Sequence, residues 1–308
     1  ARVTVPDGAV WTGSFRAPAL GISRYALDAA LAERARAVGV HLREATTVIQ
    51  VEGNLECGFE LTTRSSRGDR TFQADAVIGA HGKRSALDRA LNRPFLRAQQ
   101  PFVGLKAHFD GPALPGRVDL HTFPGGYCGL SAVEGGAINV CLLVRQSAFA
   151  RAGGDIDSFV AWMQRQNPFL RDWFARAKRI GERWLSIAQV PFVDKAPVER
   201  DILMAGDSVA LIAPLAGDGM AMALAGGRLA AHYTVKFLSG TLSPDDVCRD
   251  YARAWRREFG GRVRLGRALQ AFMLRPRLVA PGLRLLNALP ALGQFFVAQT
   301  RDTRLVGR

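Results

Sequence analysis

Residues 206–224 read GDSVALIAPLAGDGMAMAL and follow directly on the apolar run DILMA at residues 201–205. The apolar run predicts a short buried strand, and Asp207 then places a carboxylate at the carboxyl end of that strand. Pro214 fixes a turn, and the small residues after Gly219 predict a helix. Ligands of open α/β sheets bind outside the carboxyl ends of strands, so this order marks a candidate binding edge.

The residue types in this stretch suit a polar or anionic ligand. The carboxylate of Asp207 accepts hydrogen bonds and suits sugar-like hydroxyl groups. Gly217 and Gly219 let the backbone approach a ligand closely. A helix that begins near Gly219 offers free N–H groups and the positive end of its dipole to an anionic group. A glycine-rich turn that holds no ligand is the alternative, and this single loop does not decide between the two.

The composition describes an ordinary globular protein, with 308 residues, 48% hydrophobic and 22% charged. No run of about 18 apolar residues predicts a membrane-spanning helix, and the first residues do not form a signal peptide. The four cysteines lie far apart with no CxxC spacing, which predicts neither a disulfide framework nor a metal site. We therefore expect a reduced, cytoplasmic setting.

The net charge of +14 is concentrated near the C-terminus. Residues 249–308 contain 13 arginines, no lysine and three acidic residues. We favour a solvated arginine-rich face, and an anionic membrane surface is the alternative partner. The sequence has no zinc finger, RNP motif or basic heptad region, so nucleic acid is not expected.

The first hundred residues predict a mixture of one helix and several strands. Residues 23–38 have helical spacing of apolar positions, with Ser23 as a plausible N-cap and Gly39 as the stop. Residues 40–52 alternate like a strand. Residues 58–65 and 70–82 predict a hairpin pair and a short apolar strand that ends in glycines.

A second sheet is predicted from Phe102 to Val144, where short alternating segments are separated by Gly and Pro turns. A helical region follows and is expected to break near Pro168. From about Ser243 the chain is predicted to be helical and basic. We expect its prolines to divide it into separate helices: Pro276, Pro281 and Pro290.

Residues 200–231 as a whole, RDILMAGDSVALIAPLAGDGMAMALAGGRLAA, resemble the second FAD-binding motif of the glutathione-reductase-like flavoproteins. The likeness is greatest to the geranylgeranyl reductase and flavin-dependent dehydrogenase branch, which is related to the aromatic hydroxylases. ISRYALDAALAERARAVGV (22–40) is similar to its Arg-x-x-Leu-Asp helix, and ADAVIGAHGKRSALDRAL (74–91) to its Gly-Ala-Asp-Gly-x-x-Ser loop. FPGGYCGLSAVEGGAINVCLLV (123–144) resembles its Pro-Gly-Gly-Tyr strand pair. These pieces occur in the family's order.

The resemblance implies an α/β (α+β) fold: an incomplete glutathione-reductase-like FAD-binding domain with an inserted antiparallel substrate sheet and C-terminal helices. The expected FAD-binding domain takes residues 1–100 and 196–240. The expected substrate domain takes residues 101–195, and a C-terminal helical region takes residues 241–308.

The resemblance also implies five cofactor-binding residues. Arg24 would meet FAD near its pyrophosphate, and Val48 would contact it through the backbone. Asp207 would hold ribityl hydroxyls, and the backbone N–H groups of Gly219 and Met220 would face the flavin ring. Each has a structural alternative. Arg24 would be a surface arginine, Val48 an ordinary strand valine and Asp207 a capping or turn aspartate. Gly219 and Met220 would belong to a turn that serves packing alone. No metal ligand and no catalytic residue is assigned.

Two departures from the family pattern stand out. The family begins with a strand, GxGxxG and a helix, yet no such unit precedes Arg24, and PDGAVWTGS (6–14) is not one because we expect no strand before it and no helix after it. Three explanations are open: a longer protein, a unit supplied by another chain, or loss of FAD binding. His81 stands where the family's loop has Asp, and we favour a plain loop histidine over a cofactor contact.

The leading hypothesis is an FAD-dependent oxidoreductase, a dehydrogenase or reductase, that acts on a largely apolar small molecule. The alternatives are an FAD-dependent monooxygenase and a truncated, non-catalytic remnant. NAD(P)H or another donor would supply electrons, and the substrate would lie on the sheet of residues 102–144, where Tyr127 is either a substrate contact or a core tyrosine. For the tail from about Leu265 to Leu305 we favour a cap over the substrate cavity, with peripheral contact to the inner face of the membrane as the alternative.

Overall fold

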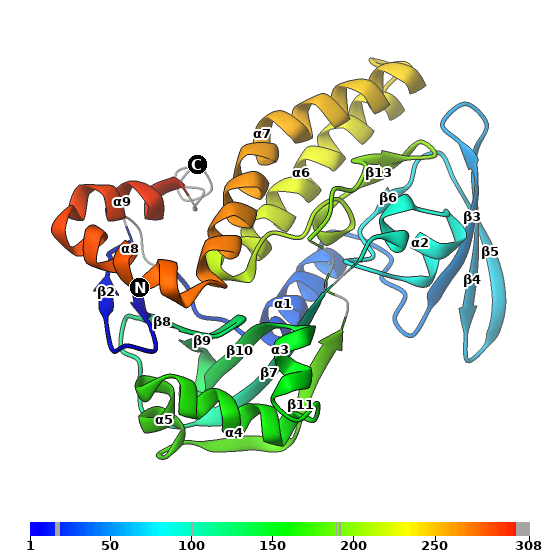
Figure 1. Ribbon diagram of the computed structural model, residues 1–308. Coiled ribbons are helices and arrows are strands. Elements are labelled where there is room, and N and C mark those ends of the chain that lie inside the picture. The colour runs from blue at the N-terminus through cyan, green and yellow to red at the C-terminus, as the bar shows by residue number, and fades with distance from the viewer. Residues whose placement is uncertain (16–18, 100, 189, 191, 300–308) are drawn as a thin grey trace. The chain divides into compact units, whose positions relative to one another are not determined.

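The computed structural model describes residues 1–15, 19–99, 101–188, 190 and 192–299, and its contacts divide the chain into two compact units (Figure 1). Unit 1 comprises residues 1–34, 99–190 and 266–306. Unit 2 comprises residues 35–98, 191–265 and 307–308. Each unit has its own hydrophobic core, and each is described by itself.

Unit 1 is built on a seven-stranded sheet with the order β11-β7-β10-β9-β8-β1-β2. All its neighbours are antiparallel except β1 and β8, which are parallel. The strands are β1 (Arg2–Thr4), β2 (Val10–Thr12), β7 (Phe102–Asp110), β8 (Val118–Phe123), β9 (Gly126–Ala132), β10 (Ile138–Arg145) and β11 (Lys178–Ala188).

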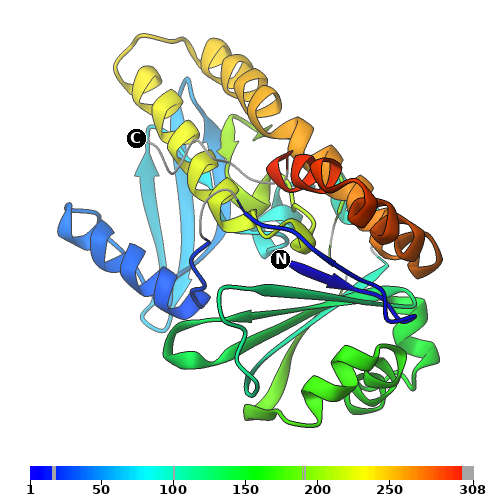
Figure 2. The same ribbon diagram turned by 90° about the vertical axis from the view of Figure 1, so that its left-hand side faces the viewer.

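Three helices, α3 (Gln146–Arg151), α4 (Ile156–Gln166) and α5 (Pro168–Phe174), lie on one side of this sheet (Figure 2). Alternate strand residues such as Leu105, Leu130 and Val140 are buried on that side in the core of unit 1. The period of two in a strand explains this pattern, because every second side chain points to the same face. The neighbouring strand residues therefore point to the opposite face of the sheet.

The helices α1 (Arg24–Ala37) and α7 (Pro244–Met273) each run from one unit into the other. Ser23 caps α1, since its Oγ accepts a hydrogen bond of 3.1 Å from the N–H of Ala26. In unit 1 the chain ends in α8 (Pro276–Ala288) and α9 (Pro290–Gln299). Among the described residues, no helix is long and apolar enough to cross a membrane.

Unit 2 contains two three-stranded sheets. One has the order β12-β13-β6, in which β13 pairs with β6 in parallel and with β12 antiparallel. The other is the antiparallel meander β3-β4-β5. The strands are β3 (Thr47–Asn54), β4 (Gly58–Ser65), β5 (Gly68–Ala74), β6 (Ile78–Gly79), β12 (Val198–Glu199) and β13 (Ile202–Met204).

Helices cover the core of unit 2, which gathers around β13. All three residues of β13 are buried, as a strand with neighbours on both sides and helices over it requires. The hydroxyl of Tyr251 on α7 donates to the carbonyl of Met204, so α7 is tied to the end of this strand. The helical elements are α2 (Ala86–Ala90), α6 (Gly219–Leu238), the first part of α7, and the short 3-10 turns at Pro94–Arg97, Gly206–Ser208 and Pro214–Ala216.

Most sequence predictions of individual elements are confirmed. The hairpin β4–β5, the antiparallel strands between Phe102 and Val144, and the helix break before Pro168 are all present. The predicted division at Pro281 is wrong, because this residue lies inside α8. The absence of a strand before PDGAVWTGS is also wrong, since β1 precedes it; β1 nevertheless forms a hairpin with β2 in unit 1, and no helix follows directly.

The predicted division into three domains stays a prediction, and the contacts group the chain into two units. Residues 1–34 group with the seven-stranded sheet, and the region 241–308 is shared between the units along α7. The region is shared because the 30 residues of α7 form one continuous helix across the boundary between residues 265 and 266, whereas the predicted boundary at residues 240 and 241 lies before this helix. The part of the predicted tail at residues 300–308 lies outside the described residues.

Candidate functional site

The Gly206 turn (residues 206–208) follows β13 and packs closely against α6. Gly206 has a φ of +60°, which a residue with a side chain adopts only with strain. A Cβ added to Gly206 would lie 3.4 Å from the Cβ of Ala223, and one added to Gly226 would lie 3.8 Å from the Gly206 nitrogen. The small residues of α6 therefore let this turn, and Asp207 within it, lie directly against the helix.

The first turn of α6 keeps its backbone donors free of a side-chain cap. Gly217 adopts a left-handed conformation (φ +65°) that turns the chain into the helix, and Asp218 is the N-cap. The side chain of Asp218 makes no capping hydrogen bond, and the first helical bond runs from the N–H of Met222 to the Asp218 carbonyl at 2.9 Å. Asp218 instead forms an ion pair with Arg262 on α7, with 3.6 Å between Nη1 and Oδ2.

The pairing with Arg262 matters for the electrostatics of the helix N-terminus. Asp218 is only 5% exposed, and an unpaired carboxylate there would compete with an anionic ligand. The guanidinium compensates this charge, so the N–H groups of Gly219 and Met220 remain suited to a ligand with partial negative charge. The side chain of Met220 is 38% exposed, which places this end of α6 at the surface of unit 2.

A buried arginine holds the Gly206 turn from the other side. Arg93 is 2% exposed and donates to the carbonyl of Ser208 at 2.8 Å and to that of Ala196 at 3.0 Å. It also forms ion pairs with Asp88 at 3.0 Å and with Glu199 at 3.4 Å. One guanidinium fork thus ties together three segments of unit 2: Asp88 on α2, residues 196–199 and the Gly206 turn.

Asp88 links this arginine to the loop after β6. Its carboxylate accepts a hydrogen bond from the guanidinium of Arg93 and another from the N–H of Ser85 at 2.7 Å. It also lies within hydrogen-bond distance, 3.0 Å, of Nε2 of His81. Burial by itself raises the pKa of Asp88, but the bonds from His81 and Arg93 outweigh it and bring the pKa to about 2. The carboxylate is therefore charged at neutral pH. The loop also meets the Gly206 turn directly, since the N–H of Gly82 donates to Ser208 Oγ at 2.9 Å.

Lys195 completes the polar network behind the turn. Its ammonium donates to the carbonyls of Lys83 and Asp207, both at 2.7 Å, and lies 4.3 Å from the centre of the Phe95 ring. Burial lowers the pKa of Lys195 to about 8, although the negative charges of Asp88 and Asp207 oppose that shift. The backbone of Asp207 is therefore fixed by a cation, and the residue as a whole is half-buried.

The structure brings three of the five predicted cofactor residues into one part of unit 2. Asp207 lies in the turn that packs on α6, and Gly219 and Met220 begin that helix. Val48 is also in unit 2, on β3, where it is half-buried against the core. Arg24 is in unit 1, exposed, with a 3.0 Å ion pair to Asp28 one helical turn away. The cofactor roles of all five residues stay predictions.

The network of Arg93, Asp88 and Lys195 was missed by the sequence reasoning. Asp88 and Arg93 lie more than 100 positions before the Gly206 turn and Lys195 lies 11 positions before it, and no spacing rule connects the three. The capping-box pattern of Ser85 and Asp88 is the one local signal in the sequence that could have marked this corner. His81 is a loop histidine as expected, and its bond to Asp88 gives it a structural partner.

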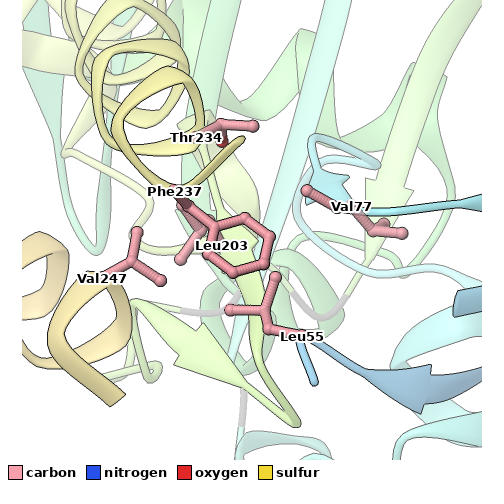
Figure 3. Close-up of a pocket in the computed structure, with 7 residues that line it drawn as sticks. Leu55, Val77, Leu203, Thr234, Phe237 and Val247 are labelled. Carbon is pink, nitrogen blue, oxygen red and sulfur yellow. The ribbon is translucent and has the colours of Figure 1, made fainter. Parts of the chain in front are cut away.

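A small apolar pocket in unit 2 is separate from this site (Figure 3). The side chains of Leu55, Leu203, Phe237 and Val247 converge on it, and it is partly open to solvent. Thr234 on its rim lies 15 residues after Gly219, which is roughly 22 Å along α6. We therefore assign the pocket to core packing at the far end of α6.

Tyr127 takes the core-tyrosine alternative. It is 2% exposed, and its hydroxyl donates to Oε1 of Gln270 at 3.2 Å within unit 1. No group of three or more potential metal ligands is present among the described residues. The four cysteines are all free thiols.

Comparison with known proteins supports the resemblance. No protein-family model matches the sequence. A digeranylgeranylglycerophospholipid reductase from Haloferax volcanii is 27% identical over 191 residues, which cover 56% of this chain and 45% of that protein. The chain thus spans less than half the length of this curated relative.

Solved structures share the fold. A geranylgeranyl bacteriochlorophyll reductase-like protein from Thermoplasma acidophilum has a TM-score of 0.73 and 18% identity, over 91% of this chain and 72% of that one. The myxobacterial chondrochloren halogenase CndH, a variant of the FAD-dependent halogenases, has a TM-score of 0.74 and 19% identity, over 89% and 67%. The chain therefore has the fold of the FAD-dependent flavoproteins of the geranylgeranyl reductase-like branch, and the predicted fold class is confirmed.

Proposed function

We propose that this chain is part of an FAD-dependent oxidoreductase and that the Gly206 turn and the first turn of α6 hold the flavin. The observation that carries the proposal is the close packing of Asp207 and its turn on the small residues of α6, beside a helix N-terminus with no side-chain cap. This places an acceptor for hydroxyl groups near donors for an electron-rich ring edge.

The residues present fit the flavin end of FAD. Asp207 would accept hydrogen bonds from ribityl hydroxyls, and the N–H groups of Gly219 and Met220 would donate to the polar edge of the ring. The buried Arg93 network would keep the turn in place, because it fixes the carbonyl of Ser208 next to Asp207. FAD, when bound, supplies the redox chemistry, and the protein supplies position and electrostatics.

The adenosine end of FAD is not assigned to residues of this chain. No GxGxxG fingerprint stands before Arg24 in the printed sequence. Arg24 remains the proposed pyrophosphate partner and Val48 a proposed backbone contact, and both follow from the resemblance alone. The activity of the whole protein is likewise a proposal, since the chain covers 45% of the curated relative.

The proposed substrate is a largely apolar small molecule, with NAD(P)H or another donor as the source of electrons. The name of the Haloferax volcanii relative, a reductase of a lipid, supports an apolar substrate. Peripheral contact with an anionic membrane belongs to the same proposal. On α8, Arg277 and Leu278 are exposed side by side, as are Arg284 and Leu285 one to two turns later, a pattern that suits such a surface.

A monooxygenase is the second candidate. The observation in its favour is the likeness of the fold to flavin-dependent halogenases as well as to reductase-like proteins. Substrate-dependent consumption of O₂ with a hydroxylated product would select the monooxygenase. Oxidation or reduction of the substrate without insertion of oxygen would select the dehydrogenase or reductase.

The direct test is the visible spectrum of the purified chain after gel filtration with added FAD. We expect flavin absorption to travel with the protein in the wild type and in Asp245→Ala, an exposed position at the start of α7 in the same unit. A protein that stays colourless at every FAD concentration would refute the proposal for this chain.

A further inference from the structure

The seven-stranded sheet of unit 1 has a second face, opposite the one that α3, α4 and α5 cover (Figure 2). The strand register places Lys106 and His108 of β7 on this face, together with Asn139 of β10 and Ser131 of β9. His108, Asn139 and Ser131 are directly opposite one another on three neighbouring strands. Part of this face is covered, since Tyr127 and Leu143 on it are each 2% exposed and Tyr127 bonds to Gln270 of α7. The polar row lies in the part whose residues are half-buried, and we call that part the open face.

Two polar atoms in this row are buried without a partner. Nε2 of His108 and Oδ1 of Asn139 have no hydrogen bond to any described residue. The amide nitrogen of Asn139 reaches Ser131 Oγ only at 3.5 Å, at the outer limit for a hydrogen bond. Buried polar atoms are normally satisfied. Nε2 of His108 can donate a hydrogen bond to a ligand, whereas Oδ1 of Asn139 is an acceptor and needs a donor such as water.

A cation stands next to this row. Lys106 is two residues from His108 on the same face and forms no ion pair with a described residue. Two acids also stand near the row: Asp110 lies two residues after His108 on β7, and Glu134 accepts a hydrogen bond from the N–H of Ser23 at 2.8 Å. Burial lowers the pKa of His108, the charge of Lys106 lowers it further, and Glu134 opposes both. At neutral pH the row thus has a neutral imidazole beside an ammonium group.

Apolar side chains and a glycine lie on the same face beside the polar row. Leu185 and Ile187 of β11 lie beside Lys106 and Gly104 in register and are 57% and 38% exposed. Gly129, also on the open face, has no atom within 3.6 Å of where a Cβ would be. A Cβ at Gly129 would fit without a clash, and apolar side chains lie at the edge strand on the other side of Lys106.

We propose that this open face binds the carboxylate of an amphipathic small molecule, with Lys106 and His108 as donors to the carboxylate and the apolar body lying across β10 toward Gly129 on β9. A carboxylate matches the ammonium in charge and accepts from a neutral imidazole N–H, and both contacts are charge-assisted. The inference rests on the proposed function, in that this molecule is the substrate of the flavin reaction. It narrows that substrate from an apolar molecule to an apolar acid.

Calorimetric titration with decanoate and with 1-decanol tests the charge requirement. The ten-carbon chain spans roughly 12 Å, or two to three strands at about 4.8 Å spacing. We expect decanoate to bind the wild type at least about tenfold more tightly than decanol, because one charge-assisted hydrogen bond contributes about that factor in affinity. Lys106→Met should abolish the difference, whereas Lys236→Met, the same substitution on α6 in unit 2, should retain it.

The imidazole is tested separately. His108→Gln keeps a side-chain N–H donor and should keep most of the preference for decanoate, whereas His108→Leu should lose it. In the wild type, decanoate but not decanol should raise the pKa of His108 measured by NMR. Equal binding of the acid and the alcohol, no binding of either, or an unchanged preference in Lys106→Met would each overturn the inference.

All of these titrations are made without added flavin and repeated with FAD. Loss of flavin binding with decanoate recognition intact would reject the proposed function and leave the carboxylate site standing. Flavin binding without any preference for decanoate would reject the carboxylate site alone.

Discussion

Replacement of Arg93 by Met removes the buried cation that fixes the Gly206 turn. The arginine is 2% exposed, and Asp88, whose side chain is fully buried, would lose a 3.0 Å ion pair. The carbonyls of Ser208 and Ala196 would lose bonds of 2.8 and 3.0 Å. Removal of one partner of a buried ion pair costs about 3–5 kcal/mol, because the remaining charge is left uncompensated.

This loss predicts a large and measurable fall in thermal stability. At about 2–4 °C per kcal/mol, the midpoint of thermal unfolding should drop by roughly 10 °C. Arg89→Met on the preceding helix α2, at an exposed position with no ion pair among the described residues, should leave the midpoint within about 1–2 °C. Arg93→Lys should be intermediate, since lysine keeps the charge and loses the fork. The assay is circular dichroism or scanning fluorimetry at pH 7.

The same variant should shift the acid sensitivity of the protein. The pKa of Asp88 is about 2 in the folded state, below its ordinary value of 3.8. Its contribution to stability is therefore complete above the ordinary value and lost as the pH falls from about 4 to about 2. Without Arg93 the folded-state pKa rises, so acid unfolding should begin at a higher pH. An Arg93→Met protein with the wild-type midpoint at pH 7 would refute the account of this network.

Three further predictions concern unit 2. Gly226→Leu should displace the Gly206 turn from α6 and weaken flavin binding at least about tenfold, as measured by flavin fluorescence. Gly227→Leu is the control, because an added Cβ there meets nothing within 4 Å, and it should bind flavin as the wild type does. Tyr251→Phe should reduce stability by about 1–2 kcal/mol in urea unfolding, because it leaves the last carbonyl of β13 without its buried donor; an unchanged midpoint would contradict that bond. The pKa of Lys195 is lowered to about 8 in the folded protein, so the unfolded chain binds more protons than the folded one between pH 8 and about 10.4. The free energy of unfolding should therefore rise across that window in the wild type relative to Lys195→Met. A difference in free energy of unfolding that does not change with pH would contradict this prediction.

The strand–turn–helix at the candidate site was predictable because its signals are local. Gly206, Pro214 and Gly217 each have a backbone requirement that few other residues meet, and two of them have positive φ values in the structure. The strands between Phe102 and Val144 were predictable for a similar reason. The alternation of apolar and polar residues and the turn residues between the strands are both visible within a few neighbouring positions of the sequence.

The errors arose where packing overrode local preference. Pro281 lies inside α8 because Val279 and Leu283, 0% and 3% exposed, hold the helix against unit 1 on both sides of it. The strand β1 has three residues and is defined by its neighbours β2 and β8, the second more than 100 positions away. Neither outcome follows from the spacing of residues in the sequence.

The network behind the Gly206 turn could not be predicted at all. Arg93 reaches the carbonyl of a residue 115 positions later, and Lys195 joins two loops that are 124 positions apart. A single arginine before a proline resembles many surface arginines in a chain with a net charge of +14. Only the folded arrangement distinguishes a buried structural cation from a solvated one.

The most direct test of the central claim compares FMN and lumiflavin, which lacks the ribityl chain, in the wild type and in Asp207→Ala. If Asp207 holds ribityl hydroxyls beside α6, the variant should bind FMN at least about tenfold more weakly and lumiflavin with unchanged affinity, as expected for the loss of hydrogen bonds to a charged group. Asp245→Ala should bind both flavins as the wild type does. Equal weakening of both flavins by Asp207→Ala, or no binding of either by the wild type, would contradict the assignment of this turn to the flavin.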